Sequence, residues 1–266
     1  MLLENKNAVI YGAAGSLGGA VSKAFAAAGA HLYLVGRTSS TLEKLAAEIH
    51  ETGGTAETAV LDAFNEQAVI DHLAKITAGG KKIDISFNAT SSDVVQDKPL
   101  VAMDVDDYMQ PINEMTRSRF ITAKAAGNIM IKQGSGVILS LTATPGGIGY
   151  PYTGGFSGGC VAVENLNTNL AAELGIYGVR AVNIRSGGSP DSAIFKQALE
   201  SAPDIMSDVL AGMKADSMLK KMPLMIDIAN LAVFLCSDLA NNITGVTVDV
   251  TGGSTVALNY RAKKNK

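Results

Sequence analysis

The chain has 266 residues, of which 47% are hydrophobic and 18% charged, and its formal net charge at neutral pH is −3. This composition predicts a folded globular protein and excludes a disordered chain. The small negative charge provides no basic surface for nucleic acid or an anionic membrane, and no apolar run reaches the roughly 18 residues that a membrane span requires. We therefore expect neither nucleic acid nor a membrane as a partner.

Cysteine and histidine usage predicts a reduced protein without a metal site. The chain contains two cysteines, Cys160 and Cys236, both in helical patterns, and none of its Cys or His spacings is typical of metal ligands. The N-terminus lacks the charged-then-apolar order of a secretion signal. These features predict a cytoplasmic, metal-free protein.

The first predicted element is a strand at residues 8–11, followed by Gly12, Gly15 and Gly18 and then by a helical pattern. A strand, a glycine turn and a helix N-terminus present free N–H groups to an anion, and the glycines let the backbone approach a pyrophosphate closely. An ordinary tight turn is the alternative, since the chain contains 28 glycines. The position of this turn at the head of the chain favours a dinucleotide site.

The second predicted strand, at 31–35, ends in Gly36, Arg37 and Thr38. An acidic residue at this place would bind a ribose 2′-hydroxyl and repel a 2′-phosphate, whereas an arginine offers a charged fork suited to phosphate. The alternative is a solvated surface arginine. We favour NADP(H) over NAD(H) as the cofactor.

The rest of the chain alternates strands with amphipathic helices. Further strands are predicted at 58–61, 83–87, 137–141, 179–184 and 246–250. Helices are predicted at 106–132, 157–174 and 226–237, after a helix opened by a Ser40–Glu43 capping box and another capped by Asn65. We predict an α/β fold in one Rossmann-type doubly wound domain spanning 1–266, with a seven-stranded, mainly parallel sheet and helices on both faces.

In such a sheet, ligands bind beyond the carboxyl ends of the strands. The third and fourth predicted strands end at Asp62 and Asn88, on the same edge as the glycine turn. The residues expected to contact the cofactor are Gly12, Gly15, Ser16, Leu17, Gly18, Arg37, Thr38, Asp62, Ala63, Asn88, Ala89, Thr90 and Gly187.

Two later segments stand apart from this alternation. The stretch 191–225 contains methionines at 206, 213, 218, 222 and 225, and flexible thioethers suit a mobile apolar lid over a substrate pocket. Core filling is an equal alternative. Residues 258–266 predict a small basic tail.

The order of these elements resembles the short-chain dehydrogenase/reductase family over nearly the whole chain. The likeness rests on Gly12-x-x-Gly15-x-x-Gly18, Asp62, Asn88-Ala89, Asn113, Asn183, Thr244-Gly245 and Asp249-x-x-Gly252-Gly253. The resemblance implies a nicotinamide cofactor, a small-molecule substrate, and a homodimer or homotetramer formed through the helices at 106–132 and 157–174.

The expected active site departs from that family, whose members use an Asn, a Ser and a Tyr-x-x-x-Lys pair. Asn113 matches the asparagine, but Ala143 stands at the serine position, Phe156 at the tyrosine and Cys160 at the lysine. Phenylalanine cannot donate a proton, and a neutral thiol is a poor replacement for an ammonium.

Two residues are candidate replacements. Thr142 could supply the hydrogen bond of the missing serine, and Tyr152 could turn its hydroxyl into the pocket, against the alternatives of strand-end bonding and simple packing. We predict catalytic roles for Asn113, Thr142 and Tyr152.

The leading hypothesis is an NADP(H)-dependent oxidoreductase with a non-standard active site that reduces an activated C=N, C=C or C=O group. The rival is a pseudoenzyme that binds NADP(H) as a sensor or scaffold. A third hypothesis is non-redox chemistry, such as elimination or hydration, in the same pocket.

Overall fold

The structure is a computed structural model that describes residues 1–256. In this range seven strands form one sheet in the order β3-β2-β1-β4-β5-β6-β7, and every neighbouring pair is parallel. The strands are β1 (Asn7–Tyr11), β2 (His31–Gly36), β3 (Thr55–Val60), β4 (Ile85–Asn88), β5 (Gly136–Ala143), β6 (Val179–Ser186) and β7 (Thr247–Val250). The predicted doubly wound sheet is confirmed. The tail predicted at 258–266 lies outside the described residues.

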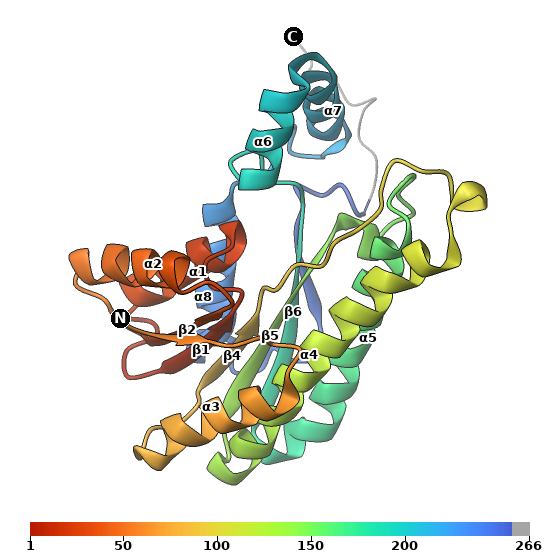
Figure 1. The fold of residues 1–266 in the computed structure, drawn as a ribbon. Helices are drawn as coiled ribbons and strands as arrows, with labels where there is room; N and C mark the ends of the chain where they lie inside the picture. Colours follow the sequence, from red (N-terminus) through yellow and green to blue (C-terminus); the bar gives the residue numbers. More distant parts are fainter. Residues whose placement is uncertain (257–266) are drawn as a thin grey trace.

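Helices cover both faces of the sheet (Figure 1). They are α1 (Ser16–Ala27), α2 (Ser39–Glu51), α3 (Glu66–Ala78), α4 (Val105–Gln133), α5 (Gly155–Leu174), α6 (Ala193–Ser201), α7 (Pro203–Asp216) and α8 (Met225–Cys236). Figure 1 shows α1, α2 and α8 together on one face and α3, α4 and α5 on the other. Short 3₁₀ helices lie at Leu100–Ala102, Thr144–Gly146, Gly175–Tyr177 and Asp238–Ala240.

Each face of the sheet buries its own apolar core. Phe25 of α1, Phe87 of β4 and Leu235 of α8 belong to one core, and Val9 of β1 and Leu73 of α3 belong to the other. Neighbouring residues of one strand point to opposite faces, so a central strand buried on both sides must be apolar throughout. This requirement explains why the continuous apolar runs were good predictors of β1 and β2.

Strand β3 shows where the sequence prediction of element boundaries was wrong. It begins at Thr55 instead of residue 58, and its Glu57 and Thr58 are exposed. As an edge strand it pairs only with β2, which tolerates the polar residues that hid its start. Strand β4 likewise runs over Ile85–Asn88, two residues later than predicted at its start.

The predicted capping box before α2 is also wrong. The N-cap is Thr38, without a side-chain cap, and Ser39 donates instead to the side chain of Glu43 at 2.6 Å. The cap of α3 is confirmed, since the Asn65 side-chain oxygen accepts the backbone N–H of Ala68 at 3.1 Å.

Helices α4 and α5 pack closely through small residues of α5. A Cβ on Gly158 would lie 2.9 Å from the Ile112 side chain, and one on Gly159 would lie 2.7 Å from the sulfur of Met115. These glycines therefore serve packing inside the chain. Helix α4 continues through Asn113, and the proline inside it is Pro111.

The helices of the expected lid stand beyond the carboxyl ends of the strands (Figure 1). Neither α6 nor α7 buries a residue, and Ile194 and Ile205 are 76% and 68% exposed. Met206 and Met213 of α7 are half-buried. None of the helices in residues 1–256 is long and apolar enough to cross a membrane.

We predict that Asn65→Ala lowers the free energy of unfolding by about 1 kcal/mol, because α3 loses its N-cap hydrogen bond. The matched control is Ser40→Ala, at an exposed position inside α2. This substitution should change the free energy of unfolding by less than about 0.5 kcal/mol. Thermal or urea unfolding followed by circular dichroism measures both. Equal losses in the two variants would contradict the assignment of the cap.

Candidate active site

The glycine turn after β1 packs directly against the chain that leaves β4. Gly12 has φ of +73°, and a Cβ there would lie 2.9 Å from the carbonyl carbon of Ala89 and from the backbone nitrogen of Thr90. A Cβ on Gly18 would overlap the carbonyl oxygen of Gly12. Both positions therefore require glycine, because any side chain would push the turn away from the sheet edge.

This turn presents the start of α1 to the same edge. Gly15 is the N-cap of α1 and has no side-chain capping bond, and the first turn of the helix carries no acidic residue. The free N–H groups and the positive end of the helix dipole at this place suit an anion. The turn is thus a cradle that fits a phosphate group.

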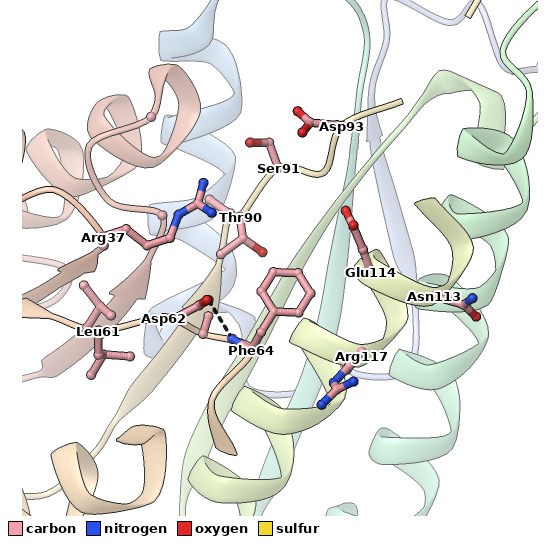
Figure 2. Close-up of a pocket in the computed structure, with 16 residues that line it drawn as sticks. Arg37, Leu61, Asp62, Phe64, Thr90, Ser91, Asp93, Asn113, Glu114 and Arg117 are labelled. Carbon is pink, nitrogen blue, oxygen red and sulfur yellow. Dashed lines mark hydrogen bonds between the residues drawn. The ribbon is translucent and has the colours of Figure 1, made fainter. Parts of the chain in front are cut away.

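A cavity of about 590 Å³ opens beside this cradle. It is lined by Gly12, Gly15, Val35, Gly36, Arg37, Leu61, Asp62, Ala63, Phe64, Ala89, Thr90, Ser91, Asp93, Asn113, Glu114 and Arg117. Figure 2 shows Arg37 entering from the end of β2, with Glu114 and Arg117 of α4 on the opposite side and Phe64 between them. Seven of the predicted cofactor residues line the cavity, namely Gly12, Gly15, Arg37, Asp62, Ala63, Ala89 and Thr90.

The other predicted cofactor residues do not line the cavity. The Asn88 side chain is buried and shapes the loop, because it accepts the Thr90 N–H at 3.0 Å and donates to Thr122 at 3.0 Å. The Ser16 hydroxyl accepts the N–H of Ala193 at 3.0 Å and so ties the glycine turn to the first residue of α6. The rest are Leu17 and the buried Gly18 on α1, the exposed Thr38 before α2, and the buried Gly187 after β6.

Sequence reasoning missed Phe64, Glu114 and Arg117 as cavity residues. Phe64 follows Asp62, and its N–H donates to the Asp62 carboxylate at 3.0 Å, which turns the chain back over the cavity. Glu114 and Arg117 come from α4. No local signal marks them, because the face that a helix turns to a cavity depends on how the helix packs.

Charges of both signs surround the cavity. Three carboxylates and two guanidinium groups line it: Asp62, Asp93, Glu114, Arg37 and Arg117. Among residues 1–256, no hydrogen bond or ion pair engages Arg37. Its guanidinium is therefore available to a ligand.

An apolar cluster occupies the next part of the sheet edge, beyond β5. Met115, Cys160 and Val163 are buried together, and Ala143 and Phe156 pack against them. Burial raises the pKa of the Cys160 thiol to about 11, against smaller opposing effects from a backbone hydrogen bond of Ala143 and from nearby arginines. Cys160 is therefore a neutral thiol at physiological pH.

The structure does not bring Asn113 into this cluster. Asn113 is exposed and lines the cavity, whereas Met115, two residues later on α4, contacts the cluster. Tyr152 is 56% exposed and has φ of +61°, and its carbonyl accepts the N–H of Asp97 at 2.9 Å.

Thr142 belongs to a polar network under the cluster. Its hydroxyl donates to Glu164 Oε1 at 2.8 Å and accepts from Asn183 Nδ2 at 2.7 Å. Arg185 donates to both oxygens of Glu164 and, through Nη1, to Asp249 at 2.7 Å. The single hydroxyl proton of Thr142 is thus used inside the protein, and sequence reasoning missed the ion network that takes it.

Within residues 1–256, no group of three or more His, Cys, Asp or Glu residues could hold a metal ion.

The parallel sheet, the glycine cradle and the cavity at the carboxyl edge define a dinucleotide-binding protein of the Rossmann type. Comparison with known proteins identifies the family within this class. A family model described as enoyl-(acyl carrier protein) reductase matches residues 12–255. The chain belongs to the short-chain dehydrogenase/reductase family, whose members bind a nicotinamide cofactor and act on small molecules, and it is an oxidoreductase of that family.

Named relatives cover nearly the whole chain. It is 27% identical over 252 residues to the 7alpha-hydroxysteroid dehydrogenase of Clostridium sardiniense, and the alignment covers 94% of each of the two chains. It is 25% identical over 261 residues to the gluconate 5-dehydrogenase of Gluconobacter oxydans, covering 96% of this chain and 97% of the relative. The crystal structure of levodione reductase matches with a TM-score of 0.88 at 25% identity, over 96% of this chain and 99% of the other.

We predict that Glu164→Gln lowers the free energy of unfolding by about 2 kcal/mol or more, because Arg185 loses one of its two carboxylates in a mostly buried place. The matched control is Glu66→Gln, whose partner Lys124 lies 2.7 Å away with both side chains about half exposed. That change should cost less than about 1 kcal/mol. Chemical denaturation measures both, and similar small losses would show that the Glu164 network contributes little to stability.

Proposed function

We propose that this protein is an NADP(H)-dependent oxidoreductase that transfers hydride without the family's usual proton donor, to or from an activated C=N, C=C or C=O group. The observation that carries this proposal is the apolar cluster of Met115, Cys160 and Val163, with Ala143 and Phe156, at the sheet edge next to the cavity. The cavity supports dinucleotide binding, and the cluster limits the chemistry that can follow.

The residues present fit the cofactor. The cradle of Gly12, Gly15 and Gly18 and the free N–H groups of α1 suit the pyrophosphate. Arg37 at the end of β2 suits a 2′-phosphate, with Thr38, Asp62 and the loop of Asn88, Ala89 and Thr90 around the two riboses. When bound, the nicotinamide ring supplies or accepts the hydride.

We infer that three of the four residues of the usual catalytic tetrad are replaced by apolar ones. Ala143, Phe156 and Cys160 stand where the family has Ser, Tyr and Lys, and Met115, instead of Asn113, shares their cluster. Cys160 has no exposed surface and stays protonated, so it provides neither a thiolate nor a cation. The cluster excludes water and leaves the reacting carbon of the substrate in an apolar environment.

The missing acid sets a limit on the substrate. Positioned proton transfer typically contributes about 10²–10⁴-fold to a rate, and this site forgoes it. Holding the two reactants in contact is a separate advantage, which the site keeps. A substrate that is already electron-deficient, such as an iminium ion or an activated alkene, needs least from the missing donor.

The two helices beyond the sheet support an apolar substrate. Ile194 of α6, Ile205 of α7 and the following Leu219 are between 64% and 76% exposed. Met213 and Phe195 reach back to Gly188, at the end of β6, where a Cβ would lie 2.6 Å and 2.7 Å from them. We propose that the segment 191–225 is a lid that covers a small or mid-sized apolar substrate inside a one-domain protein.

We also propose a homodimer or homotetramer formed through α4 and α5. Phe120 of α4 and Val161 of α5 are 49% and 51% exposed, which leaves large apolar side chains on both helices for a second copy.

A second candidate function is cofactor binding without turnover, as a sensor or scaffold. It is favoured by the hydrogen bonds of Thr142, whose proton goes to Glu164 at 2.8 Å, and by the outward position of Tyr152. The hydroxyl proton of Thr142 is therefore not free for a substrate in this conformation.

Label transfer decides between these functions. The protein is incubated with NADPH carrying deuterium at both C4 positions and with a panel of ketones, activated alkenes and imines, and products are read by mass spectrometry. We expect deuterium in the imine or alkene products and little in simple ketones. NADPH binding without label in any product would favour the sensor or scaffold, and products formed without cofactor consumption would indicate non-redox chemistry.

We predict that Arg37→Ala weakens NADPH binding by about tenfold or more and NADH binding by less than about twofold, because only NADPH carries the 2′-phosphate. Isothermal titration calorimetry measures both affinities. The matched control is Arg117→Ala on the opposite side of the cavity, which should affect the two cofactors alike. Equal effects of Arg37→Ala on both cofactors would remove the phosphate assignment.

A further inference from the structure

Arg119 is a buried arginine that lacks a carboxylate partner. It lies on α4, is 5% exposed, and takes part in no ion pair within the described range 1–256. Its Nη2 donates to the carbonyl oxygen of Thr90 at 2.9 Å, and Nη1 has only long contacts, 3.4 Å to the Thr90 hydroxyl and 3.3 Å to that of Ser118. Its Nε has no partner.

This arrangement differs from the other internal arginines. Arg185 is held by two carboxylates, and Arg180 donates to three backbone carbonyls, of residues 235, 237 and 243. Burial lowers the pKa of Arg119 to about 10, which still leaves it charged at neutral pH. A buried cation without a counter-charge is unfavourable, and such a group beside a cleft is a candidate functional residue.

Arg119 lies between the cofactor cavity and the apolar cluster. On one side its partner Thr90 lines the cavity and packs against Gly12 of the glycine cradle. On the other side Arg119 follows Met115 by one helical turn, and its charge acts on the Cys160 thiol, which stands at the position of the family's lysine.

The strand order assigns Arg119 to one half of the cofactor. Arg37 follows β2 and Thr90 follows β4, on opposite sides of β1. A dinucleotide spans the crevice at this reversal of strand order, with one nucleotide on each side. The half on the Arg37 side carries the adenine if Arg37 binds the 2′-phosphate, so the half beside Thr90 carries the nicotinamide.

We propose that Arg119 is a positioning residue for the nicotinamide half of the cofactor, acting through Thr90 and supplying the positive charge that Cys160 cannot. This inference rests on the proposed dinucleotide binding. Through its bond to the Thr90 carbonyl, Arg119 holds the loop that borders the nicotinamide half of the crevice.

Two ligands separate the halves of the cofactor. NADPH contains both halves, and adenosine 2′,5′-bisphosphate contains only the adenine half. Titration calorimetry of the full chain gives both affinities for wild type, Arg119→Met, Arg119→Lys and Arg117→Met. Arg117 is the matched control because it is an exposed arginine of the same helix that lines the cavity beside Phe64.

We expect Arg119→Met to weaken NADPH by about tenfold or more and the bisphosphate by less than about twofold. Arg119→Lys keeps the charge and should recover most of the NADPH affinity, whereas Arg117→Met should affect both ligands by the same factor. The melting temperature of ligand-free Arg119→Met should be unchanged or higher, because an unpaired buried charge is removed, while its rise on adding NADPH should shrink.

Equal weakening of both ligands by Arg119→Met would overturn the inference, because a merely structural arginine disturbs the whole site. Failure of the wild type to bind any dinucleotide would instead overturn the proposed function, and the inference with it. NADH paired with adenosine monophosphate gives the same ratio test without the 2′-phosphate, so the result does not depend on Arg37.

Discussion

The close approach of the β1–α1 turn to the loop that leaves β4 governs the rest of the site. Gly12 lies so near Ala89 and Thr90 that no side chain fits between them. This backbone contact fixes the start of α1 at the crevice, and Asn88 holds the facing loop by bonding Thr90. The cavity, the free N–H groups of α1 and the carbonyl that Arg119 binds all take their positions from it.

The carboxyl edge of the sheet is divided into two chemically different parts. Beyond β1 to β4 the cavity carries charges of both signs among apolar side chains. Beyond β5 the side chains are apolar, and the polar groups beneath them bond to one another in the network of Thr142, Glu164 and Arg185. The charged part suits a charged cofactor. The apolar part can contact a substrate, but it has few groups for acid–base chemistry.

The charges of the two internal arginines of this region, Arg185 and Arg119, are compensated differently. Arg185 is neutralised by Glu164 and Asp249, so its charge stabilises the link between α5 and the β6–β7 edge. Within residues 1–256, the hydrogen-bond partners of Arg119 are all uncharged oxygens. A paired charge is already compensated within the protein. An unpaired charge is stabilised more strongly by an anionic ligand, because it has no other counter-charge.

The fold and the cofactor side of the site could be predicted from the amino-acid sequence. Short continuous apolar runs indicate strands buried on both faces, and the glycine turn with Arg37, Asp62 and Thr90 follows strands whose ends meet at one edge. Which residues of α4 face inward could not be predicted in this way. The tertiary structure placed Met115 in the cluster, Asn113 at the cavity and Arg119 beneath Thr90, because the rotation of a long helix depends on its packing against α5 and β4.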